Sequence, residues 1–198
     1  GQVTESSLSV GKGKSAKQIE TLTLTTGGVS VSQTTLENEL DLNAGTLDTV
    51  LSNPSGSTDA TEGSGVAGSF AAKAGDVVTF DYFFDGGDYL PFNDFAFVAI
   101  NGEAQKLTSI ADNGNYGDTS GIYQFVIQES DIIDGIINFA IGITDVPEYA
   151  NLSAGIATAL TTGTIIDYKV IPLYESSDVV KVSKLFKDVS PTYRKPGS

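Results

Sequence analysis

The stretch VVTFDYFF, residues 77–84, decides the fold of this chain. Successive residues of a β-strand point to opposite faces of its sheet, so Val78, Phe80, Tyr82 and Phe84 share one face. The opposite face mixes apolar residues with Asp81. This pattern predicts a half-buried strand, with an aromatic face against a core and a second face near solvent.

Similar short runs of β-branched and aromatic residues recur along the chain, separated by turns rich in glycine, asparagine and aspartate. A glycine pair at 27–28 predicts a hairpin between two of these runs. Residues 36–65 contain only sparse leucines and then a polar run, which predicts a long surface loop. We expect strands over residues 21–25, 29–32, 66–70, 77–84, 95–100, 106–110, 122–127, 136–143 and 164–173.

These strands follow one another without helical segments between them. The sequence therefore predicts an all-β fold, a two-sheet antiparallel β-sandwich of jelly-roll or related Greek-key type with N- and C-terminal arms. We expect residues 1–65 to form an N-terminal arm whose strands and loop pack on the sandwich. Residues 66–173 form the sandwich itself, and residues 174–198 form a basic C-terminal arm.

The composition excludes several classes of chemistry. The chain has no histidine, cysteine, methionine or tryptophan, which removes the usual nucleophile–base pairs, thiolate metal sites and disulfides. No apolar stretch approaches the roughly 20 residues that a membrane-spanning helix needs, so we expect no membrane insertion.

Charge is distributed unevenly within the net −14. Residues 18–167 carry 21 acidic side chains and two lysines, a net charge of −19, whereas residues 1–17 carry +2 and residues 169–198 carry +3. An acidic body repels nucleic acid and attracts divalent cations, so we expect no nucleic-acid partner. Acidity that only keeps the protein soluble is the alternative.

One segment combines aromatic and acidic residues. Eight of the 18 aromatic residues lie between Phe80 and Phe97, interleaved with carboxylates. Buried carboxylates without a counter-charge are costly, and a cation would offset that cost. Calcium prefers oxygen ligands, and a glycine-containing loop such as Asp85-Gly86-Gly87-Asp88 can wrap around one ion. Solvated loop acids are the alternative interpretation.

Residues 74–82 and 88–97 resemble the ligand-binding β-sandwich modules of bacterial repeats-in-toxin adhesins, and 113–119 and 141–145 are similar in type and order. The resemblance covers about residues 65–170, and Asn93-Asp94-Phe95 is its most specific part. It implies an extracellular, calcium-dependent module that binds a peptide or glycan ligand on another surface. With Asp85 added from composition, the expected calcium ligands are Asp85, Asp88, Asn93, Asp94 and Asp145. The expected ligand contacts are Tyr89, Asn113, Tyr116 and Asp118.

These observations favour a non-enzymatic, calcium-stabilised module that mediates surface attachment or ligand binding, outside the cell or on its surface. The adhesin module requires neither a 65-residue lead nor a basic tail, and similar sandwiches occur in phage tail, fibre and decoration proteins. The alternative is therefore a self-assembling subunit of a surface filament or a virion, a homo-oligomer joined through its terminal arms. A glycan-hydrolysing carboxylate pair such as Asp85 and Asp94 is a third possibility, although we expect no enzymatic activity.

Overall fold

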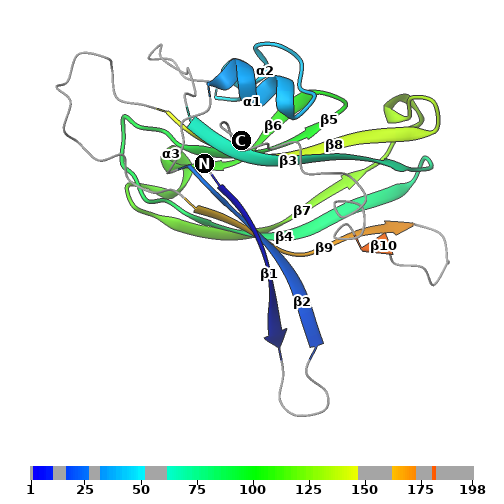
Figure 1. Cartoon of the computed structure of the whole chain (residues 1–198), viewed down its shortest axis with the longest axis horizontal. Coiled ribbons are helices and arrows are strands. Elements are labelled where there is room, and N and C mark those ends of the chain that lie inside the picture. The colour runs from blue at the N-terminus through cyan, green and yellow to red at the C-terminus, as the bar shows by residue number, and fades with distance from the viewer. Residues whose placement is uncertain are drawn as a thin grey trace, which may run out of the picture.

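The computed structural model describes residues 2–10, 17–26, 32–51, 62–146, 162–172 and 180–181. Two antiparallel sheets stack face to face, with two short helices on the outer side of one of them (Figure 1). The predicted all-β sandwich is confirmed. Among the described residues, no helix is long and apolar enough to cross a bilayer.

The six-stranded sheet has the order β1-β2-β9-β4-β7, and β10 also pairs with β9. Its strands are β1 (Gln2–Val10), β2 (Lys17–Thr25), β4 (Asp76–Asp85), β7 (Asp118–Val126), β9 (Thr162–Pro172) and β10 (Val180–Lys181). The N-terminal strands therefore belong to the same sheet as β4. In Figure 1, β1 and β2 extend beyond the rest of this sheet as a pair.

The four-stranded sheet has the order β3-β8-β5-β6. Its strands are β3 (Glu62–Ala71), β5 (Phe95–Ile100), β6 (Glu103–Ser109) and β8 (Ile136–Asp145). β5 and β8 are central. β5 and the residues of β8 after Asn138 are buried on both faces, because one face meets the other sheet and the opposite face meets the helices. Two short elements, α3 (Ile110–Asn113) and the 3-10 helix η2 (Glu129–Asp131), lie in connections.

The main core fills the space between the sheets. Val78, Phe80 and Phe84 of β4 are buried there, and the Phe80 ring packs edge-on against Phe139 of β8 at 6.2 Å between centroids. The aromatic face predicted for residues 77–84 therefore lies against the core. Burial of several large aromatic and branched side chains, each worth about 1.5–3 kcal/mol, drives the pairing of the two sheets.

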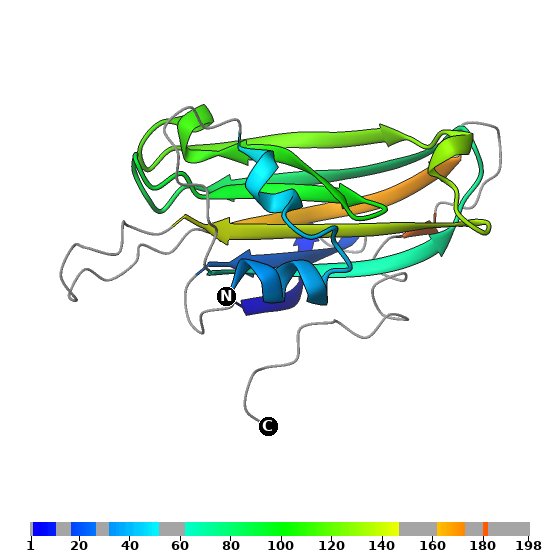
Figure 2. The same ribbon diagram turned by 90° about the horizontal axis from the view of Figure 1, so that it is seen from above.

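Helices α1 (Gln33–Glu39) and α2 (Thr46–Val50) cover the outer face of the four-stranded sheet, as the turned view in Figure 2 also shows. They form a second apolar cluster with Phe95 and Phe97 of β5. Ser32 begins α1, because its hydroxyl accepts the N–H of Thr35 at 3.2 Å. The leucines of this cluster are Leu36, Leu40, Leu42, Leu47 and Leu51.

A buried glutamate joins the two helices. Glu37 is 3% exposed, and its carboxylate accepts the N–H groups of Gly45 and Leu47 at 2.9 and 3.0 Å. These donors belong to the first turn of α2, where backbone N–H groups have no partner within the helix. The Glu37 carboxylate therefore gives two backbone N–H groups at the start of α2 a hydrogen-bond acceptor, and the same bonds stabilise the buried carboxylate.

Three expectations about the first 65 residues were wrong. Residues 33–39 and 46–50 form two helices, which contain Leu36 and Leu47, and β3 begins at Glu62 rather than at position 66. The expected hairpin around Gly27-Gly28 does not use β2, because Thr21–Thr25 already pairs with β1 on one side and β9 on the other. Residues 27–31 lie outside the described residues, as do residues 174–198 except β10.

Candidate metal centre and aromatic surface

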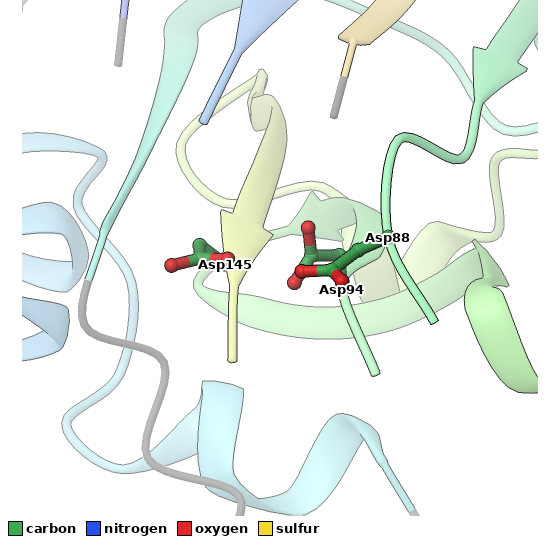
Figure 3. Close-up of side chains that lie close together, drawn as sticks. All are labelled: Asp88, Asp94 and Asp145. Carbon is green, nitrogen blue, oxygen red and sulfur yellow. The ribbon is translucent and has the colours of Figure 1, made fainter. Parts of the chain in front are cut away.

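Three aspartates meet at one end of the sandwich. One carboxylate oxygen from each of Asp88, Asp94 and Asp145 lies within 4.8 Å of the others (Figure 3). Their side chains are 5%, 0% and 1% exposed. This is the most acidic buried site in the part of the chain that the structure describes.

Strand pairing brings two of these residues together. Asp145 ends β8, Asp94 immediately precedes β5, and the two strands pair with Phe95 opposite Thr144. Ile143 of β8 and Ala96 of β5 both belong to the core between the sheets. Because side chains alternate along a strand, Asp145 and Asp94 occupy the next inward positions, at the end of that core.

Asp88 reaches the same place from the loop between β4 and β5. Its backbone oxygen accepts the N–H of Tyr116 at 2.7 Å, and the N–H of Leu90 donates to the Asn115 side chain at 2.9 Å. The loop after α3 therefore holds the β4–β5 loop by two hydrogen bonds, one of them through the Asn115 side chain. A cross-connection of this kind limits the movement of Asp88 relative to the strands.

Backbone donors support the negative charge of the cluster. Asp94 Oδ1 accepts the buried N–H of Val146 at 3.0 Å, and Asp88 Oδ1 accepts the N–H of Tyr89 at 2.8 Å. Hydrogen bonds to a carboxylate favour its ionised form. Three carboxylates this close repel one another, by about 3.5 kcal/mol per pair at 4.8 Å and an effective dielectric constant of about 20.

A bound cation of charge +2 would turn this repulsion into attraction. The available donors are all oxygens, and the chain contains no histidine or cysteine. Carboxylate and carbonyl oxygens suit calcium or magnesium, and zinc prefers nitrogen and sulfur ligands. Calcium accepts six to eight oxygens in flexible geometry, which fits a site made of two strand ends and a loop.

The other two expected calcium ligands occupy different positions. Asn93 is buried beside the cluster, and its side-chain oxygen accepts the N–H of Ala111 at 2.8 Å. The N–H of Ile110 donates to the Asp94 backbone oxygen at 3.0 Å. In this structure Asn93 therefore anchors α3 to the start of β5 and so positions Asp94.

Asp85 is not a member of the three-aspartate cluster. It ends β4 directly opposite Asp118 of β7, and it is exposed on the sheet face that points away from the core. Partial burial raises the pKa of Asp85, and the hydrogen bond with Asp118 and the charge of that acid raise it further. Asp85 therefore holds its proton more tightly than an isolated aspartate does.

Aromatic side chains form a surface next to the cluster. The ring of Tyr89 packs edge-on against buried Phe92 at 5.1 Å and lies 5.7 Å from the ring of Tyr116. Tyr89 is 36% exposed and Tyr116 is 62% exposed, so both rings offer area to a ligand. Tyr89 follows Asp88 directly, and the backbone bond from Tyr116 to Asp88 connects this surface to the acidic cluster.

The other two residues expected to contact a ligand, Asn113 and Asp118, stand on either side of Tyr116 in the sequence. Asn113 ends α3, and its side-chain N–H donates to the hydroxyl of Thr108 at 3.0 Å. Asp118 is exposed beside Asp85. The structure thus brings Tyr89 and Tyr116 together, and it gives Asn113 and Asp118 separate partners.

Sequence reasoning missed Asn115, which holds the β4–β5 loop through Leu90. Its position in the turn Asn113-Gly114-Asn115 was the available signal, because asparagine side chains commonly hydrogen-bond to backbone groups in turns. The partner of such a side chain depends on which loops meet, and the sequence of one loop does not contain that information.

Comparison with known proteins assigns the chain to no family. No protein-family model matches the chain, and no curated protein is significantly similar to it in sequence. The adhesin resemblance therefore rests on the residues quoted above, and the geometry of the site carries the functional argument.

Proposed function

We propose that this chain is a non-enzymatic, calcium-stabilised module that binds a peptide or glycan ligand on another surface, outside the cell. The observation that carries the proposal is the buried group of Asp88, Asp94 and Asp145, whose oxygens lie within 4.8 Å of one another. Buried carboxylates in such proximity are costly unless they are compensated, and a divalent cation compensates all three together.

The proposed ion would act mainly on the loop that carries the aromatic surface. Asp88 contributes its carboxylate to the cluster, its backbone oxygen to Tyr116, and its chain neighbour Tyr89 to the exposed surface. An ion that fixes Asp88 therefore fixes both tyrosines. Less conformational freedom remains to be lost when a ligand binds, so ion binding increases ligand affinity.

The exposed tyrosines suit a ligand with an apolar face. A tyrosine ring supplies flat contact area at a small entropy cost and a hydroxyl for a hydrogen bond. The apolar face of a sugar ring and the side chains of an extended peptide both match this chemistry. The absence of histidine and cysteine from the sequence agrees with a binding role.

The first test is the thermal unfolding of the chain in millimolar calcium and in excess EDTA. An ion present at about 100 times its Kd adds about 2.7 kcal/mol, which raises Tm by about 5–10 °C for a chain of this length. Asp145→Asn should abolish the difference, and the matched control Asp134→Asn, an exposed turn residue, should retain it. Equal melting temperatures of the wild-type chain in both buffers would refute the ion.

The second test concerns the ligand. The immobilised chain is screened against glycan and peptide arrays in calcium and in EDTA. We expect binding in calcium that Tyr116→Ala reduces and that Ile133→Ala, at an exposed position outside the aromatic surface, leaves unchanged. Binding that is indifferent to Tyr116→Ala would refute the assignment of the aromatic surface.

A further inference from the structure

The edge of the six-stranded sheet at β7 has the features of an acceptor for another strand. β7 pairs with β4 alone among the described strands, over nine residues and without a register shift. Its outer side therefore presents a row of backbone N–H and C=O groups along the full strand. Rows of this kind form hydrogen bonds with an added strand.

The two edges of the other sheet differ from β7. β6 carries the charged residues Glu103 and Lys106, and its register with β5 shifts between Ala96 and Phe97. At β3, the hydroxyl of Ser64 donates to the backbone oxygen of Thr25 and accepts the N–H of the same residue. Charges, bulges and coverage are the usual devices that prevent strand addition.

Among the described residues, β7 has only one of these devices, a charge at its first position. Its sequence DTSGIYQFV contains no lysine and no proline, and its only charged residue is Asp118 at the first position. On the face that points away from the core, Ile122 is 67% exposed, Val126 is 44% exposed, and Phe83 of β4 is 37% exposed. Exposed apolar area beside an unprotected edge indicates an interaction surface.

The charges on this face specify the partner. The exposed acids Asp81, Asp85 and Asp118 lie on β4 and β7 among the apolar residues. An added strand lies directly beside β7 and one strand away from β4. A complementary strand therefore needs apolar residues for Ile122 and Val126, and long basic side chains that reach Asp118 and the acids of β4.

Residues 179–187 of the chain, VVKVSKLFK, have this composition, with three lysines, five large apolar residues and no acid. Two of these residues form β10, whose register places Lys181 directly opposite Lys169 of β9. Like charges at opposed positions weaken a strand pair. The lysine pair therefore weakens the two-residue pairing within one chain, whereas β7 carries Asp118 and no basic residue.

We propose that residues 179–187 of one copy add as a strand to the β7 edge of a second copy. The donor and the acceptor are different surfaces, so the contact is head-to-tail and extends into a linear assembly. The inference concerns a different surface from the proposed calcium and ligand sites and does not depend on them.

The test is sedimentation of the full chain over a concentration series, at saturating calcium. We expect the weight-average mass to at least double with concentration, and high salt to reverse the increase because the contact is partly electrostatic. Ile122→Lys should abolish association, whereas Ile133→Lys, the same change at an exposed isoleucine outside β7, should preserve it. The double change Lys181→Glu with Lys184→Glu should also abolish it.

Mixing the two defective chains provides the decisive control. A chain with Ile122→Lys keeps its donor segment, and a chain with the two glutamates keeps its acceptor edge. Their mixture should form a dimer that grows no further, even though each variant alone is monomeric. A monomeric wild-type chain throughout the series, association that survives Ile122→Lys, or variants that fail to complement each other would each overturn the proposal.

Discussion

Neutralising Asp94 should change stability in opposite directions with and without calcium. Asp94 is fully buried, and its side chain lies in a cluster whose oxygens are within 4.8 Å of one another. Without an ion, Asp94→Asn removes two repulsive pairs of carboxylates, each of about 3.5 kcal/mol at 4.8 Å and an effective dielectric constant of about 20. The amide oxygen can still accept the N–H of Val146. We therefore expect the variant to be more stable than the wild-type chain in EDTA.

With calcium, the same change removes a ligand. The wild-type chain gains about 2.7 kcal/mol when calcium is at about 100 times its Kd, and the variant loses most of this gain. At about 2–4 °C per kcal/mol, Tm of Asp94→Asn should exceed that of the wild-type chain in EDTA and fall below it in calcium. The assay is calorimetry in both buffers, with Asp134→Asn as control. A variant destabilised equally in both would refute the electrostatic account.

Three further predictions concern stability and are measured by urea unfolding. Glu37→Ala should cost about 1–3 kcal/mol, because two backbone donors lose their acceptor, and Glu37→Gln should cost less. Gly142→Ala should cost about 1–3 kcal/mol, because the added methyl overlaps the Phe97 ring; an unchanged midpoint would contradict this packing. The raised pKa of Asp85 means that the folded chain binds a proton on this carboxyl group more tightly than the unfolded chain does. The stability that this proton contributes therefore falls as pH rises above 3.8. Asp85→Asn should make that fall shallower, and an identical pH profile would contradict the pairing with Asp118.

The central strands of the fold were predictable because their side chains face a core. Residues 77–84 and 95–100 carry the alternation or the continuous apolar run that burial on one or two faces requires. The helices α1 and α2 were missed because they are seven and five residues long. Helices this short depend on tertiary contacts, here with Phe95 and Phe97, and leave little periodicity in the sequence.

The candidate site was predictable in composition and only partly in geometry. Asp88 and Asp94 are near in sequence, whereas Asp145 joins them because β5 pairs with β8, which local patterns do not specify. The position of Asp85 follows from strand alternation. Phe84 faces the core, so the next residue faces away from it. The β4 pattern therefore already separates Asp85 from residues that converge at the end of the core.

The central claim is that Asp88, Asp94 and Asp145 bind one calcium ion. Isothermal titration of the calcium-stripped chain with calcium tests it most directly. We predict saturable binding of one ion per chain at this site, lost in Asp145→Asn and retained in Asp134→Asn. A wild-type chain that shows no saturable calcium binding, or an Asp145→Asn chain that binds as the wild type does, would contradict it.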